Sequence, residues 1–118
     1  MNSENPSMFD PRITLAQVDG DRDLLKELIE IFAGQYKKNL ALLEESLKKN
    51  DAPAFRLAAH TIKGSAANFR AQTAFDLARR LEEMGKTGEF SQAPAALDAL
   101  VAELERLEKA LREFVSKG

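Results

Sequence analysis

Cysteine and tryptophan are absent from the 118 residues, and histidine and tyrosine each occur only once. Without cysteine the chain can form no disulfide, no thiolate nucleophile and no cysteine-ligated zinc or iron–sulfur site. No stretch approaches the roughly 20 apolar residues that span a bilayer, and the N-terminus lacks the basic-then-apolar pattern of a signal peptide. The net charge of −2 disfavours general binding to nucleic-acid phosphates. These absences predict a cytoplasmic protein with no membrane or nucleic-acid partner.

The residues that are abundant favour helices. Ala, Glu, Lys, Leu and Arg make up more than half of the chain, whereas Val, Ile and Thr are few. This balance disfavours a β-sandwich, a barrel or a parallel sheet. We expect a flexible leader over residues 1–9 and one domain over residues 10–118.

Capping residues and prolines mark the expected helix ends. They predict a short helix over about residues 11–18, a segment from Asp21 to Asn50 that bends or breaks at Gly34, and helices over about residues 52–70, 72–84 and 91–116. Gly85 fits the C-terminal cap of the 72–84 helix. Short connections make successive helices antiparallel, so the predicted fold is an all-α, antiparallel up-down four-helix bundle with a short N-terminal helix.

The segment from Phe55 to Phe69 has a clear apolar stripe. At about 100° per residue, six side chains fall on one side of the helix and predict its buried face: Phe55, Ala58, Ala59, Ile62, Ala66 and Phe69. The only histidine, His60, falls outside this stripe and is expected to point to solvent.

Three features around His60 distinguish it from an ordinary surface residue. Gly64 follows one turn later, although a mid-helix glycine costs about 1 kcal/mol relative to alanine. Lys63, at i+3, can place its ammonium beside any group attached to the ring. Leu57 and Ala67 make the exposed side flat and apolar, as suits a docking surface. An exposed imidazole is a competent nucleophile at cellular pH, and an attached phosphate would add about two negative charges for the lysine to offset.

Other chemistries fit these residues less well. The positions three and four residues from His60 hold only Arg, Leu, Lys and Gly, so no second metal ligand lies beside it on the helix. Ser65 points in another direction, which disfavours a hydrolytic triad. The isolated Gly64 does not form a glycine-rich phosphate loop. The residues predict a phosphate acceptor without metal, cofactor or ATP-binding site.

The sequence HTIKGSAANF at residues 60–69, preceded by two alanines, resembles the signature of the histidine-containing phosphotransfer (HPt) domain. The similarity extends to residues 18–21 and 81–86 and covers nearly the whole chain from about residue 10. The resemblance implies a monomeric four-helix bundle in which His60 is phosphorylated on Nε2, Lys63 neighbours the phosphate and Gly64 is a steric window. The family usually has glycine where this chain has Arg70, which leaves the form of that turn open.

On this resemblance we expect a phosphorelay intermediate. A receiver domain phosphorylated on aspartate would pass its phosphoryl group to His60, and the receiver domain of a response regulator would take it from there. The expected docking residues are Arg56, Leu57, Thr61, Ala67, Asn68 and Arg70. The partner receiver would supply Mg²⁺, a sensor or hybrid histidine kinase would act upstream, and the chain itself would have no kinase activity.

Three alternatives remain at this point. The chain could be the phosphoacceptor domain of a chemotaxis-type histidine kinase. It could be a non-catalytic helical adaptor with a degenerate site, although Lys63 and Gly64 beside His60 count against degeneration. It could also be a homodimer held by the apolar stripe over residues 97–115, instead of the expected monomer. Met1 and the leader favour a stand-alone protein over an excised domain.

Overall fold

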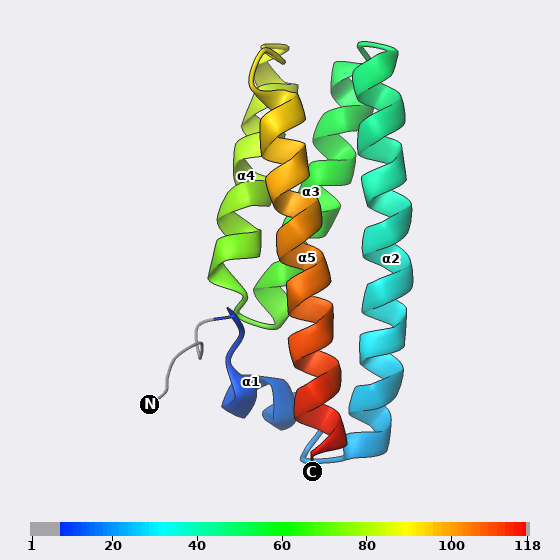
Figure 1. The fold of residues 1–118 in the computed structure, drawn as a ribbon, viewed down its shortest axis with the longest axis vertical. Helices are drawn as coiled ribbons and strands as arrows, with labels where there is room; N and C mark the ends of the chain where they lie inside the picture. Colours follow the sequence, from blue (N-terminus) through cyan, green and yellow to red (C-terminus); the bar gives the residue numbers. More distant parts are fainter. Residues whose placement is uncertain (1–7, 118) are drawn as a thin grey trace.

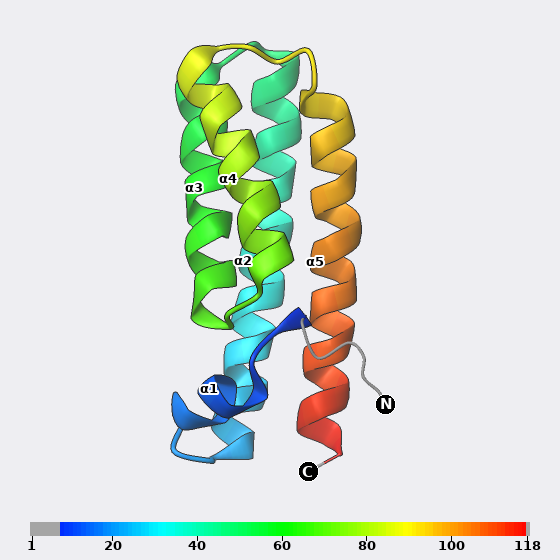
Figure 2. The ribbon, with the colours of Figure 1, turned by 90° about the vertical axis from the view of Figure 1, so that its left-hand side faces the viewer.

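The computed structural model describes residues 8–117. Within this range, five helices follow one another: α1 (Pro11–Ala16), α2 (Arg22–Lys48), α3 (Ala52–Asn68), α4 (Gln72–Thr87) and α5 (Ala93–Ser116). Each of the four long helices packs against two neighbours, α2 and α4 both lying between α3 and α5 (Figure 1). Successive long helices run antiparallel, and α1 lies against the start of α2 (Figure 2). The predicted all-α, up-down four-helix bundle with a short N-terminal helix is confirmed.

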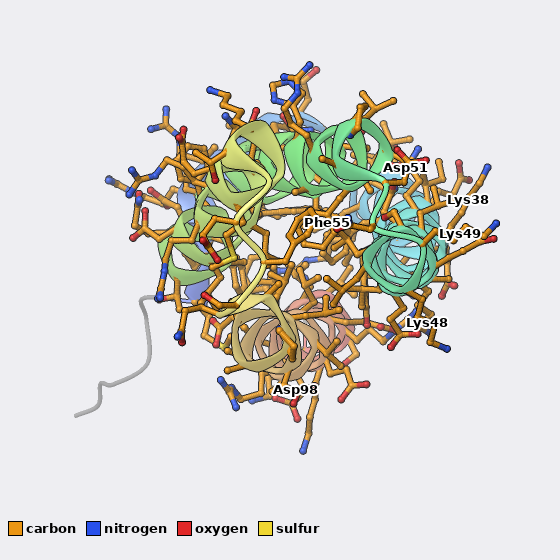
Figure 3. The ribbon with its side chains drawn as sticks, turned by 90° about the horizontal axis from the view of Figure 1, so that it is seen from above. Lys38, Lys48, Lys49, Asp51, Phe55 and Asp98 are labelled. Atoms are coloured by element: carbon orange, nitrogen blue, oxygen red, sulfur yellow. The ribbon has the colours of Figure 1, made fainter. Side chains whose placement is uncertain are left out.

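The core runs along the bundle axis. Seen from above, Phe55 points into the centre, whereas Lys38, Lys48 and Asp98 point outward (Figure 3). All six residues of the stripe predicted for the third long segment are buried: Phe55, Ala58, Ala59, Ile62, Ala66 and Phe69. The spacing of apolar residues in α3 therefore determines which of its side chains are exposed to solvent.

Aspartates start the first three helices, as predicted. The side chains of Asp10, Asp21 and Asp51 each accept a hydrogen bond, 3.0 to 3.1 Å long, from a backbone N–H in the first turn of α1, α2 and α3. These contacts satisfy N–H groups that have no partner inside the helix. The first residue of α3, the helix that carries His60, is thus set by the capping aspartate directly before it.

The break expected at Gly34 is wrong, because α2 is one unbroken helix of 27 residues. Gly34 lies on the exposed side of α2, and nothing within 4 Å would meet a Cβ added there. Its neighbours Phe32, Ala33 and Tyr36 are buried in the core. Packing of these three residues holds the helix together through the glycine.

The expected boundary of the leader is also wrong for its last residues. Phe9 is buried, and its ring packs edge-on against Phe114 with the ring centroids 5.5 Å apart. The backbone N–H of Asp10 donates a hydrogen bond to the carbonyl of Phe69, 3.0 Å away. Phe9, directly before the cap of α1, is thus part of the core of the bundle. Residues 1–7 of the predicted leader lie outside the described residues.

The end of α4 differs from the prediction as well. The helix continues to Thr87, and its cap is Gly88, which has a left-handed φ of +74°. Gly85, the predicted cap, is buried inside the helix where α4 meets α3.

Between residues 8 and 117, no helix has the length and apolarity of a membrane span.

Candidate functional site

His60 lies in the middle of α3 with 59% of its side chain exposed, as the helical period predicts. Its ring leans toward α4, where Nδ1 lies 2.8 Å from Oε2 of Glu82. The other carboxylate oxygen of Glu82, Oε1, lies 2.7 Å from Nζ of Lys63. One carboxylate therefore contacts both His60 and Lys63.

Glu82 is a site residue that the sequence analysis missed. Only 6% of its side chain is exposed, although an isolated buried carboxylate is costly. The hydrogen bond from Lys63 lowers the pKa of Glu82 below its ordinary value, with a smaller contribution from His60, and both outweigh the opposing effect of burial. Glu82 is thus ionised at neutral pH and can only accept hydrogen bonds.

An ionised acceptor determines the tautomer of His60. Because Glu82 cannot donate, Nδ1 of His60 must carry a proton, and in the neutral ring the free electron pair is then on Nε2. The two ring nitrogens lie on different edges of the imidazole, so Nε2 is directed away from α4. The geometry thus presents Nε2 as a nucleophile to solvent, in agreement with the nitrogen that the resemblance implies.

Gly85 explains how Glu82 reaches the histidine. A Cβ added to Gly85 would lie 2.8 Å from the Cα, Cβ and N atoms of Arg56, closer than real Cβ atoms come to other atoms. Glycine therefore allows α3 and α4 to approach closely at this level. Glu82 precedes Gly85 by one turn and His60 follows Arg56 by one turn, so the close contact brings the two side chains together.

Lys63 is paired in this structure. The sequence predicted only that its ammonium could lie beside a group on the ring; here the ammonium contacts Glu82 and lies 5.9 Å from the centre of the Phe75 ring. Only 23% of the side chain is exposed. Lys63 remains beside His60 because both contact the same carboxylate.

Gly64 leaves open space next to the histidine. The residue is exposed, and a Cβ built on it would meet nothing within 4 Å. No structural contact therefore requires glycine at this position, although glycine destabilises a helix. Free space one turn from His60 is what another molecule would need in order to approach the ring.

The six expected docking residues are all exposed: Arg56, Leu57, Thr61, Ala67, Asn68 and Arg70. They do not all lie on the same side of α3. Arg56 and Ala67 lie toward α4, the first against Gly85 and the second beside Phe75. Asn68 lies toward α2, and Leu57 and Thr61 precede it at helical spacing on that side. The hydroxyl of Ser65 donates a hydrogen bond to the carbonyl of Thr61.

Arg70 occupies a left-handed position at the end of α3, with a φ of +55°. Its N–H donates to the carbonyl of Ala67, and the N–H of Ala71 donates to the carbonyl of Ala66. The distance from nitrogen to oxygen is 3.0 Å in both hydrogen bonds. This pair of bonds is the Schellman motif, which usually has glycine where this chain has Arg70. The turn is therefore kept with arginine in a conformation that favours glycine.

Replacing Arg70 by glycine is expected to raise the free energy of unfolding by about 0.5–1 kcal/mol. The left-handed conformation costs a residue with a Cβ about 1–2 kcal/mol, and glycine loses part of that gain through its greater freedom in the unfolded chain. Urea unfolding measures the change. Arg70→Ala keeps the Cβ and should show no gain. A loss of stability in Arg70→Gly would mean that the arginine side chain holds the turn.

Lys63→Ala is expected to lower the free energy of unfolding at pH 7 by about 1–3 kcal/mol, because the buried carboxylate of Glu82 loses its main donor. A carboxyl group with a lowered pKa adds stability above its ordinary pKa of about 4.3 and loses it as the pH falls through the lowered value. The difference between wild type and Lys63→Ala should therefore shrink between pH 5 and pH 3, since protonated Glu82 has less need of the cation.

The exposed pair of Lys49 and Glu45, 2.8 Å apart, provides the control for this experiment. Lys49→Ala should leave the free energy of unfolding essentially unchanged at either pH, because exposed ion pairs contribute little. Urea unfolding of both variants at pH 7 and pH 3.5 makes the comparison. A constant deficit of Lys63→Ala across this range would show that the lysine contributes by packing alone.

Comparison with known proteins shows the family and the fold of the chain. The family model of the Hpt domain matches residues 27–110. In fold, the chain is similar to histidine-containing phosphotransfer protein B (HptB) from Pseudomonas aeruginosa, with a TM-score of 0.87 and 24% identity over 97% of this chain and 99% of that one. It is also similar to the HPT domain of a sensor hybrid histidine kinase from Shewanella, with a TM-score of 0.75 and 16% identity over 97% of this chain and 98% of that one.

No curated protein sequence matches the chain. The matched residues 27–110 nevertheless cover well over half of its length and include His60, Lys63, Gly64 and Glu82. The helical bundle and the presentation of the histidine agree with that match. The chain therefore belongs to the Hpt domain family, whose role is histidine phosphotransfer in phosphorelays.

Proposed function

We propose that His60 carries a phosphoryl group from the phosphorylated aspartate of one receiver domain to the aspartate of another. The observation that supports this most strongly is the contact between Nδ1 of His60 and the ionised, buried Glu82, which leaves Nε2 free and exposed. The chain acts as a phosphocarrier in the cytoplasm, and a sensor or hybrid histidine kinase supplies the phosphoryl group upstream.

The transfer step needs no proton acceptor. The electron pair on Nε2 attacks the phosphorus in line, the N–P bond forms, and the P–O bond to the aspartate breaks so that the aspartate leaves as a carboxylate. The proton stays on Nδ1, the ring becomes positively charged, and Glu82 stabilises that charge through its hydrogen bond. The reverse step on a second receiver restores the neutral ring.

Lys63 and Gly64 assist the transfer in different ways. Lys63 lies beside the ring and offsets the charge of the phosphoryl group, because an ammonium next to phosphate forms a strong, charge-assisted hydrogen bond. Gly64 allows the partner to come close enough for in-line geometry. We propose that any Mg²⁺ belongs to the partner, since no three acidic or histidine side chains gather at one point among residues 8–117.

Transfer from receiver domains tests this function. A panel of purified receiver domains, each carrying ³²P on its aspartate, is mixed with the protein, and label on each chain is followed with time. We expect rapid transfer from at least one receiver and no labelling from ATP alone. Labelling by the ATP-binding domain of a chemotaxis-type kinase, with none from any receiver, would instead support the phosphoacceptor alternative.

A further inference from the structure

Arg70 stands out among the residues with a left-handed backbone. Within residues 8–117, three residues other than glycine have a positive φ: Asp19 (+52°), Asn50 (+56°) and Arg70 (+55°). Aspartate and asparagine tolerate this conformation because their short polar side chains can bond to the local backbone, whereas arginine has no such advantage. Strain that no local contact offsets is typical of positions where a side chain serves binding.

The Arg70 side chain is exposed, and no carboxylate of residues 8–117 forms an ion pair with its guanidinium. Asp76, in the first turns of α4, already has partners. Nε2 of Gln72 donates to Asp76 over 2.9 Å, and a nitrogen of Arg79 lies 3.6 Å from the same carboxylate oxygen. Within this part of the chain, a cation is therefore available where α3 turns into α4 (Figure 1).

Arg70 lines a hollow of about 320 Å³ beside this turn. The other lining residues come from α3, from the turn and from α4: Ala67, Ala71, Gln72 and Phe75. The two alanines and the half-buried Phe75 are apolar, so the lining combines apolar surface with one cation and one amide. Such a lining suits a side chain that has an apolar stem and a carboxylate at its end.

The hollow lies in line with the histidine. Ala67 follows His60 by seven residues, which is two turns, so it lies on the same side of α3 and about 10 Å further along the axis. Gly64 stands between the two and leaves open space. A partner domain that covers His60 and Gly64 therefore extends over the hollow.

The side of α3 that carries Arg70 is positively charged. Arg56, Lys63 and Arg70 follow one another at intervals of seven residues, so the three cations form one row along the helix. Glu82, the buried acid beside this row, is already paired with Lys63. The charge of the row is thus complementary to an acidic surface on a partner.

We infer that Arg70 and the hollow bind an acidic side chain of the receiver domain over His60, and that this contact selects among receivers. The inference rests on the proposed function, because the partner is one that exchanges a phosphoryl group with His60. A guanidinium can form two parallel hydrogen bonds with one carboxylate. A receiver that has a basic or apolar residue at this place leaves the arginine without a partner and transfers more slowly.

Substitutions of Arg70 provide the test. With the fastest ³²P-labelled receiver of the panel, we expect the second-order rate of transfer to fall about tenfold in Arg70→Ala and about a hundredfold in Arg70→Glu. The rate at saturating receiver should stay unchanged, because Arg70 lies away from the reacting atoms. Lys109→Ala removes the same charge from an exposed position on α5 and should keep the wild-type rate.

Arg70→Gly separates the contact from the stability of the turn. This variant is expected to be more stable than wild type, yet its second-order rate should fall as far as that of Arg70→Ala. Phosphoramidate, a small donor that cannot fill the hollow, should label wild type and all variants equally. Raising NaCl from 50 to 500 mM should slow wild type more than Arg70→Ala, because salt screens the charge contact.

Charge exchange identifies the acidic partner residue. Each exposed Asp or Glu of the fastest receiver is changed to Lys in turn, and each variant is tested against wild type and Arg70→Glu. We expect one receiver variant to be slow with wild type and to recover with Arg70→Glu. Recovery with none of them would overturn the acidic contact.

The other contrary results are also distinct. Wild-type rates in Arg70→Ala and Arg70→Glu, or an equal loss in Lys109→Ala, would overturn the role of Arg70 while leaving the proposed function in place. A loss by the same factor with every receiver of the panel would overturn the selection among receivers. Labelling of wild type by phosphoramidate but by no receiver would overturn the proposed function itself.

Discussion

His60→Gln is expected to fold normally and to accept no phosphoryl group from any receiver. The free energy of unfolding should fall by no more than about 0.5–1.5 kcal/mol, because the glutamine amide can still donate to Glu82, which also keeps its bond to Lys63. Circular dichroism and urea unfolding measure the fold, and ³²P transfer measures the function. Label that persists on His60→Gln would place the phosphoryl group on another residue.

Gly64→Gln should separate stability from function. Glutamine is a better helix former than glycine by roughly 0.5–1 kcal/mol, and nothing within 4 Å obstructs a Cβ at this position, so the melting temperature should rise. The longer side chain would cover the open edge of His60. Since a misplacement of about 1 Å can cost 10²-fold, we expect transfer from a receiver to slow by about that factor.

Gly34→Gln is the matched control for Gly64→Gln. Gly34 is also an exposed mid-helix glycine with no atom within 4 Å of an added Cβ, but it lies on α2 away from the seam with α3. It should give a similar gain in stability and transfer phosphate at the wild-type rate. If Gly64→Gln were stabilised and transferred just as fast, Gly64 would not act as a steric window.

Local signals in the sequence predicted much of the fold. Asp10, Asp21 and Asp51 mark helix starts because a side-chain oxygen satisfies free N–H groups wherever it precedes a helix. The apolar period of α3 predicted both its buried stripe and the exposure of His60, because these two features depend on one helix alone.

Features that depend on two helices were not predictable in this way. Gly34 and Gly85 look alike in the sequence, yet the first lies in solvent within an unbroken helix and the second lets α4 approach Arg56. Glu82 reaches His60 only because of that approach. A hint was present in the chain: Glu82 adjoins the apolar stripe of Ala78, Leu81 and Gly85, where a lone carboxylate needs a partner from another helix.

The site of phosphorylation tests the central claim most directly. Protein labelled with ¹⁵N and phosphorylated by a receiver domain is examined by NMR for coupling between phosphorus and the ring nitrogens of His60, which is the only histidine. We expect the phosphorus on Nε2 and a proton on Nδ1, as the contact with Glu82 requires. Phosphorus on Nδ1, or on any residue other than His60, would contradict the account.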